Sequence, residues 1–124
     1  MSLSLNDQLL RDLDKMQEEL SFTGRSEVIR AALRLFLMEE RDKQRLKGLV
    51  SGLLIAIHSH EAEHHVTQIK REYQDIIHMQ LHNRFREGKC MELFLIEGDS
   101  GRVKDLSTEL QRNEENDYVK LIII

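Results

Sequence analysis

Apolar side chains recur every three or four residues through residues 1 to 47, which is the spacing of one helix face. Two runs carry this pattern. The first contains Leu9, Leu10, Leu13, Met16 and Leu20, and the second contains Val28, Ile29, Leu33, Phe36 and Leu37. The pattern predicts two amphipathic helices joined by a turn at FTGR.

Polar residues beside these runs predict where the helices begin and end. Asn6 is expected to cap the first helix, and Ser26 with Glu27 is expected to open the second with a cap and a favourable negative charge. Gly48 is expected at the C-terminal cap position, after the basic segment RDKQRLK. Ahead of the first helix, the alternation in MSLSL predicts a short strand, whose unpaired edges a second copy of the chain could satisfy.

From Gly48 onward the pattern is that of strand, helix, strand, strand, helix, strand. LVSGLLIAIH is apolar on both faces, as in a central strand, and a helix from about Glu61 follows. Residues 75 to 86 alternate as a strand, REGK predicts a hairpin loop, and CMELFLIEG is the next strand. A helix capped by Asp99 or Ser100 and the strand DYVKLIII complete the order.

The expected fold class is therefore α+β, with a strand-helix-helix unit in residues 1–47 followed by a ferredoxin-like βαββαβ unit in residues 48–124. Both helices of the second unit are expected on one sheet face, so the other, partly apolar face needs a partner subunit. Neither part could bury a large core alone, which again favours oligomerisation.

Composition narrows the function classes only slightly. The net charge is -4, with nine basic and nine acidic residues up to residue 47 and nine and thirteen after it. Nucleic-acid binding must therefore rest on local geometry. The chain lacks a run of roughly 18 apolar residues and a leader pattern, so we expect a cytoplasmic protein. Its single cysteine, Cys90, excludes a disulfide within the chain.

Six histidines raise the question of a metal site. His58 and His60 fall at a strand end, and His64 and His65 fall on a helix among charged residues. These four are expected to be surface or interfacial histidines, because the segment HSHEAEHH matches no defined metal motif. Weak cation binding there is the alternative.

Several segments together resemble the NikR family of nickel-responsive regulators. They are GRSEVIRAAL in the second helix, EYQD before the second strand, LHNR within it, and CMELFLIEGDSGRV. The resemblance covers nearly the whole chain and implies a ribbon-helix-helix DNA-binding half, an ACT-like regulatory half, and a homotetramer built as a dimer of dimers.

Physical reasoning supports the DNA-binding half independently. Two MSLSL strands paired antiparallel would form a ribbon that fits the DNA major groove, with Ser2 and Ser4 facing the bases. The backbone amides of Arg25, Ser26 and Glu27, at a helix N-terminus, are suited to hold a phosphate. The family's usual basic residue on the ribbon is missing here.

The resemblance also implies a square-planar nickel site shared by two subunits. Its four ligand positions fall on Arg71, His82, Arg84 and Cys90, so only His82 and Cys90 are retained. Arginine offers no lone pair and cannot replace an imidazole ligand.

Strand alternation predicts the surroundings of these residues. It places His78, His82 and Arg84 on one face with Cys90 and Glu92, which makes His78 a candidate extra ligand. Arg84 is expected to lower the pKa of Cys90 or to pair with Glu92. Nickel is the metal implied by the resemblance, and zinc and copper are the alternatives.

The function expected from these observations is a DNA-binding transcriptional regulator with an altered metal or effector site, and not an enzyme. A metal- or small-molecule-binding module whose N-terminal half serves only oligomerisation is the principal alternative. An antitoxin-like repressor, which would bind a toxin through its second half, is a third.

Overall fold

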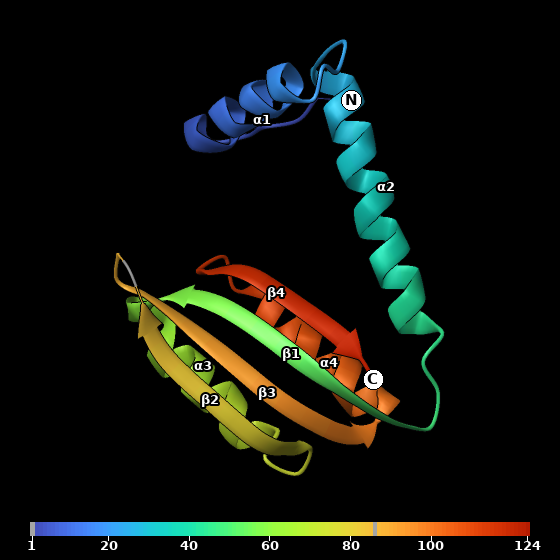
Figure 1. Cartoon of the computed structure of the whole chain (residues 1–124), viewed down its shortest axis with the longest axis vertical. Helices are drawn as coiled ribbons and strands as arrows, with labels where there is room; N and C mark the ends of the chain where they lie inside the picture. Colours follow the sequence, from blue (N-terminus) through green and yellow to red (C-terminus); the bar gives the residue numbers. More distant parts are fainter. Residues whose placement is uncertain (1, 86) are drawn as a thin grey trace. The chain divides into compact units, whose positions relative to one another are not determined.

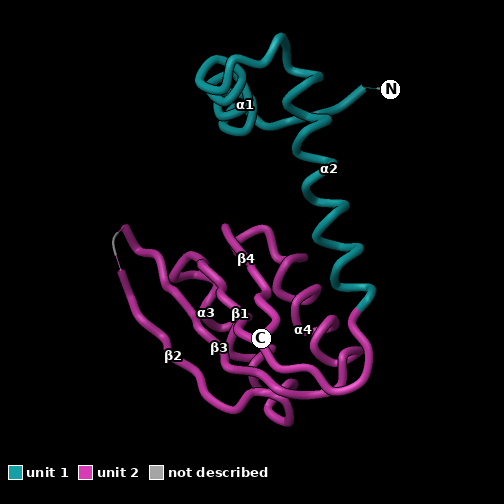
Figure 2. Tube along the Cα trace, turned by 45° about the vertical axis from the view of Figure 1, so that its right-hand side comes forward, with its two compact units in different colours: residues 1–45 teal, residues 46–124 magenta. Residues whose placement is uncertain are grey.

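The computed structural model describes residues 2–85 and 87–124 (Figure 1). The chain divides into two compact units, Met1–Arg45 and Leu46–Ile124 (Figure 2). The first unit holds helices and the second a mixed helix and sheet structure, which confirms the predicted α+β class.

The first unit contains helix α1, Asp7–Glu19, and helix α2, Arg25–Gln44. The predicted cap of α1 is confirmed, because the Asn6 side chain accepts a 2.8 Å hydrogen bond from the Leu9 amide. The predicted N-cap of α2, Ser26, lies two residues after the observed one. Gly24 is the N-cap and Ser26 lies inside the first turn, where the Glu27 carboxylate reaches back to accept a 2.8 Å hydrogen bond from the Thr23 amide.

The far end of α2 also differs from the prediction. The helix stops at Gln44 with Arg45 as its cap, so Gly48 lies three residues beyond the cap. Gly48 has φ of +68°, and its carbonyl accepts a 2.8 Å hydrogen bond from the Ser100 amide. Its conformation therefore serves the entry into the following strand, where glycine tolerates a positive φ at no steric cost.

The segment before α1 is not a strand in the single chain. Residues 2–6 have no regular secondary structure, because a strand needs a hydrogen-bonded neighbour and the residues that the structure describes include none for this segment. Neither helix of this unit contains a buried residue, and Leu33, Phe36 and Met38 are each about half exposed. The first unit thus leaves apolar surface without a cover.

The second unit is one sheet with two α-helices, in the order that the sequence predicts. Its strands are β1 (Leu49–Ser59), β2 (Ile77–Phe85), β3 (Lys89–Asp99) and β4 (Asn116–Ile123), arranged as β2-β3-β1-β4 with every neighbouring pair antiparallel. A 3₁₀ turn, η1 (His60–Ala62), leads into α3 (Glu63–Glu72), and α4 spans Ser100–Arg112. Asp99 caps α4 by accepting a 2.9 Å hydrogen bond from the Gly101 amide.

Both helices cover the same face of the sheet (Figure 1). The core lies between them and that face, where Leu54, Phe94, Ile96, Val66, Ile69, Val103, Leu106 and Leu110 are buried. On the opposite face, Leu53 pairs with Leu95 and Ile122, and Leu81 pairs with Leu93. Leu81 is 60% exposed there, so this apolar face is uncovered in the single chain.

Candidate metal centre

Strand register brings five polar, charged or thiol side chains together at one end of the covered sheet face. His58, Cys90 and Arg84 form one row across β1, β3 and β2, and Ala56, Glu92 and His82 form the next. Directly paired residues point to the same face of a sheet. The predicted sharing of a face by His82, Arg84, Cys90 and Glu92 is therefore confirmed.

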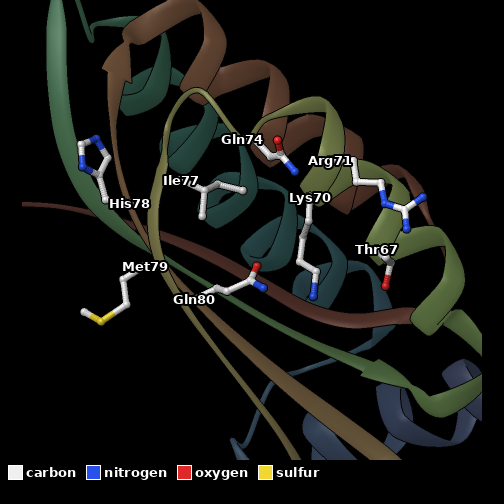
Figure 3. A pocket seen from close by; sticks show the side chains of 8 residues that line it. All are labelled: Thr67, Lys70, Arg71, Gln74, Ile77, His78, Met79 and Gln80. Carbon is white, nitrogen blue, oxygen red and sulfur yellow. The ribbon is translucent and has the colours of Figure 1, made fainter.

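His78 does not share that face, which corrects the expectation. The β2–β3 register shifts between Ile77 and Met79, because Ile77 pairs with Ile96 while Met79 pairs with Leu95. A bulge of this kind adds one residue and reverses the alternation on one side of it. Figure 3 shows the His78 side chain pointing away from Lys70 and Gln80, so the geometric argument for His78 as an extra ligand is lost.

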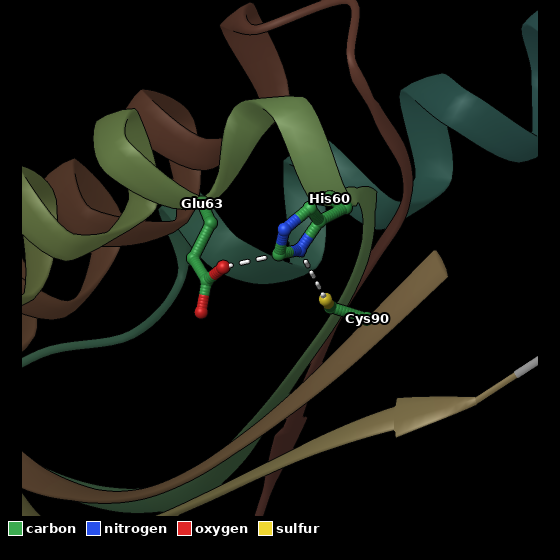
Figure 4. A group of neighbouring side chains, drawn as sticks. All are labelled: His60, Glu63 and Cys90. Atoms are coloured by element: carbon green, nitrogen blue, oxygen red, sulfur yellow. Dashed lines mark hydrogen bonds and ion pairs between the residues drawn. The ribbon is translucent and has the colours of Figure 1, made fainter. Parts of the chain in front are cut away.

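The structure instead assembles a donor cluster around Cys90. The Cys90 Sγ lies 3.9 Å from His60 Nδ1, and that nitrogen lies 3.2 Å from Glu63 Oε2 (Figure 4). These three donor atoms all lie within 4.8 Å of one another. His82 joins the edge of the cluster, since its Nε2 lies 3.5 Å from the other Glu63 oxygen.

Sequence reasoning missed His60 and Glu63 as members of this site. The turn η1 and the first residue of α3 carry them over the end of β3 where Cys90 lies, although His60 is thirty positions earlier in the sequence. The His60 amide also donates a 2.8 Å hydrogen bond to the Gly88 carbonyl in the β2–β3 hairpin, which holds the turn beside Cys90. The spacing of His60 and Glu63 by three residues at a helix start was the available signal, but it gave no indication of Cys90.

Two further polar groups are buried beside the cluster. His58 is fully buried, so its assignment as a surface or interfacial histidine is wrong for this chain. Its Nδ1 lies 2.7 Å from the Ser59 carbonyl, and its ring stacks on that of His82 with centroids 6.5 Å apart. Among the described residues, His58 Nε2 and Glu92 Oε2 are buried without a hydrogen-bond partner.

Glu92 pairs with a lysine and not with the predicted arginine. The Lys70 Nζ lies 3.0 Å from Glu92 Oε1, and Glu92 is only 2% exposed. A buried carboxylate needs a counter-charge. Lys70 of α3 provides it, in place of Arg84, to which the prediction had assigned this role.

The thiol of Cys90 is harder to ionise than the prediction held. Burial raises its pKa, and the negative charge of Glu63 raises it further. Arg84 lowers the pKa as expected, but this smaller effect is outweighed, and Glu92 adds to the increase. The expected net lowering is therefore wrong, because full desolvation disfavours the thiolate more than one nearby cation favours it.

Arg71 lies in a different place from Cys90 within one chain. It lines a cavity of about 410 Å³ between α3 and the first residues of β2, together with Thr67, Lys70, Gln74, Ile77, His78, Met79 and Gln80 (Figure 3). Cys90 pairs with Arg84 near the opposite end of β2. Within one chain, the two positions therefore lie beside different ends of β2.

In the first unit, the two charged side chains proposed near DNA have partners within the chain. Arg25 donates two hydrogen bonds to Asp14, at 2.8 and 2.9 Å, which raise the pKa of Arg25 and lower that of Asp14. Glu27 has a lowered pKa because it accepts from the Thr23 hydroxyl and amide. Arg25, Ser26 and Glu27 open α2, and the first amides of a helix have no acceptor within it.

Together, a helix pair with an unpaired N-terminal arm and a following ferredoxin-like unit form an arrangement typical of DNA-binding proteins with a separate regulatory domain. Two family profiles match the chain accordingly. Residues 1–40 match "Ribbon-helix-helix protein, copG family", and residues 52–124 match "NikR C terminal nickel binding domain".

Relatives that are similar over the full length of the chain indicate the same family. One, from Methanocaldococcus jannaschii, is 32% identical, and another, from Methanococcus maripaludis strain S2, is 30% identical; each alignment covers 100% of this chain and 90% of the relative. Both are assigned by name as nickel-responsive regulators. The chain therefore belongs to the NikR family of nickel-responsive regulators, which confirms the expected class, a ribbon-helix-helix transcriptional regulator.

A solved structure supports the fold alone. An uncharacterized protein from Thermotoga maritima superposes with a TM-score of 0.58 at 15% identity, covering 62% of this chain and 99% of that one. In the part of the chain that the structure describes, no helix is both long and apolar enough to cross a membrane.

The residues present do not fit the nickel set that the family resemblance implies. Square-planar nickel needs four lone-pair donors, and two of the four positions hold guanidinium groups, at Arg71 and Arg84. The donors that the fold places beside Cys90 come from His60 and Glu63 instead. The matched domain is described as a nickel-binding one, whereas the ligand positions that the resemblance implies for this chain include two arginines.

Proposed function

We propose that the chain acts as a homotetrameric, metal-responsive regulator in which residues 2–5 of two copies pair into a ribbon that enters the DNA major groove. The observation that carries this proposal is the incomplete first unit. Its N-terminal arm is exposed and unpaired, and its helices bury nothing within the single chain. A second copy satisfies both needs at once.

Contacts to DNA divide into two kinds in this proposal. Ser2 and Ser4 reach base edges from the ribbon, while the amides that open α2, at Arg25, Ser26 and Glu27, hold a phosphate and fix the register. The Arg25 guanidinium donates hydrogen bonds to Asp14 and so links α2 to α1. The phosphate is therefore held by the backbone amides.

The second unit supplies the response to an effector. The donors around Cys90 bind a transition metal, and the uncovered apolar sheet face joins two dimers into the tetramer. Occupation of the metal centre changes DNA affinity by favouring one arrangement of the tetramer, as linkage between two sites requires.

Selection of genomic DNA fragments by the full-length protein tests the DNA-binding part of the proposal. At moderate salt, wild type should enrich one palindromic sequence, with affinity falling steeply as salt rises because several phosphates are neutralised. Ser4→Glu should abolish the enrichment, since a carboxylate would face the bases and phosphates. Thr108→Glu adds the same charge at an exposed position of α4 and should leave enrichment unchanged.

Circular dichroism and light scattering should be the same for all three proteins. A wild type that enriches no sequence, or a Ser4→Glu variant that enriches the same one, would contradict the proposed ribbon.

A further inference from the structure

We infer that each chain holds one divalent metal ion of the zinc class in a four-coordinate site of its own, with His60, Glu63 and Cys90 as ligands and His82 as the fourth. This deepens the proposed function and rests on its metal response. It differs from the family's arrangement in ligand identity, in geometry and in drawing every ligand from one subunit.

Donor spacing is the first argument. Zinc bonds to nitrogen and oxygen of roughly 2.0–2.2 Å, and to sulfur of about 2.3 Å, place neighbouring donors of a tetrahedron roughly 3.3–3.8 Å apart. The distances from His60 Nδ1 to Glu63 Oε2 and to Cys90 Sγ are 3.2 and 3.9 Å, and that from His82 Nε2 to Glu63 Oε1 is 3.5 Å. The donor atoms of His60, Glu63 and Cys90 lie within 4.8 Å of one another, and His82 approaches the second oxygen of the same carboxylate, so rotation of the Glu63 carboxylate and the His82 ring would bring the fourth donor to the ion.

The ligands are also held in place before an ion arrives. Cys90 is fixed on a buried strand, and the hydrogen bond from the His60 amide to Gly88 secures the turn that carries His60. The buried His58 ring stacks on His82 at an interplanar angle of 18°, which restricts the orientation of that imidazole. His60 and Glu63 remain partly exposed, so an ion can reach the site from solvent.

Ligand chemistry selects the class of metal. One thiolate, two imidazoles and one carboxylate are a set that zinc accepts in tetrahedral geometry, whereas square-planar nickel favours strong nitrogen and sulfur donors. Binding exchanges the Cys90 thiol proton for the ion, and the proton leaves to solvent. The two anionic ligands, Glu63 and the Cys90 thiolate, neutralise the two positive charges of the ion, so that only the charge of Arg84 on the same face adds to the neutral metal set.

Cobalt(II) titration of the metal-free, full-length protein, followed by absorption, tests the site directly. We expect one ion per chain, with a thiolate-to-cobalt charge-transfer band and visible bands of four-coordinate intensity, all displaced by zinc. His60→Ala, Glu63→Gln and Cys90→Ser should each weaken binding by more than about a hundred-fold, since loss of a mere hydrogen-bond partner of a ligand already costs roughly ten- to a hundred-fold. His65→Ala, on an exposed position of α3, is the matched control and should bind as wild type does.

Mixed assemblies separate a site within one chain from a shared one. Tetramers co-assembled from His60→Ala and Cys90→Ser chains should regain no cobalt site, because no single chain then holds all the ligands. Recovery of the bands in such mixtures would overturn the inference.

Two further outcomes would also overturn it. One is absence of stoichiometric cobalt binding, and the other is a strong square-planar nickel band that depends on Cys90 but not on His60. Neither outcome affects the enrichment of DNA by the metal-free or nickel-loaded protein, so failure of this site and failure of the proposed function are distinguishable.

Discussion

Buried polar side chains lie together at one end of the covered sheet face, where a buried charge needs a nearby partner to stabilise it. Glu92 is the most demanding of them, because it is almost fully buried and carries a carboxylate. Lys70 supplies the counter-charge from α3, with its own side chain only 18% exposed. The pair therefore links the helix layer to the sheet directly behind the metal centre.

Removal of Lys70 alone should destabilise the protein strongly. Lys70→Met leaves the Glu92 carboxylate buried and unpaired, which typically costs about 3–5 kcal/mol in the free energy of unfolding. The double variant Lys70→Met/Glu92→Leu should recover most of that loss, since no buried charge remains. Urea denaturation at one fixed protein concentration measures both.

Lys15→Met is the control, because Lys15 is exposed and its ion pair with Glu19 spans 3.8 Å. We expect a change of less than about 0.5 kcal/mol for it. Equal stabilities for Lys70→Met and Lys15→Met would show that the Lys70–Glu92 pair does not carry the buried charge.

The backbones of β1 and β4 approach each other closely at Gly52. Gly52 lies on β1 opposite Ile123 of β4, and a Cβ atom added to Gly52 would lie only 2.5 Å from the Ile122 carbonyl oxygen. That oxygen belongs to a paired strand and cannot rotate away as the end of a side chain could. The glycine therefore allows β4 to lie against β1 at this point.

Gly52→Ala should push β4 away from β1 and cost about 1–3 kcal/mol, the usual range for overpacking a well-packed interior. Thermal unfolding at fixed concentration checks this, together with hydrogen exchange of the β4 amides, which should become faster. Leu49→Ala on the same strand is the control, since Leu49 is 74% exposed and should change stability by less than about 0.5 kcal/mol. Unchanged β4 exchange in Gly52→Ala would contradict the close-approach argument.

Each of the two units leaves apolar surface exposed when the chain is alone. The first exposes apolar helix surface, and the second exposes the sheet face that carries Leu81, Met91, Tyr118 and Ile122. Apolar surfaces of this kind mark protein–protein interfaces. Two different unsatisfied surfaces on one chain are what a dimer of dimers requires.

A charge on the open sheet face should divide the tetramer into dimers. Leu81→Glu places a carboxylate among apolar neighbours that we propose meet a second dimer, so its burial would be strongly unfavourable. Light scattering at micromolar concentration should report a tetramer for wild type and a dimer for Leu81→Glu. Thr108→Glu should remain tetrameric, and a monomeric wild type would refute both proposed interfaces.

Local sequence was sufficient to predict most helices and strands and several of the residues at which they begin. Helix and strand periodicity predicted the two helices of the first unit and the order of strands and α-helices in the second. Asn6 and Asp99 cap their helices as expected, because a cap depends on a few adjacent residues. The pairing of Arg84 with Cys90 also followed from the short hairpin between them.

Contacts between distant elements decided the chemistry of the site. The bulge that removes His78 from the shared face, the burial of His58 and the meeting of His60 with Cys90 all depend on how α3 and the strands pack. The pKa of Cys90 is raised and not lowered as predicted, because burial is a property of the assembled core that the neighbouring residues in the sequence do not indicate. Periodicity reports the environment along one element, whereas a metal centre is made from donors that only the tertiary structure brings within bonding distance.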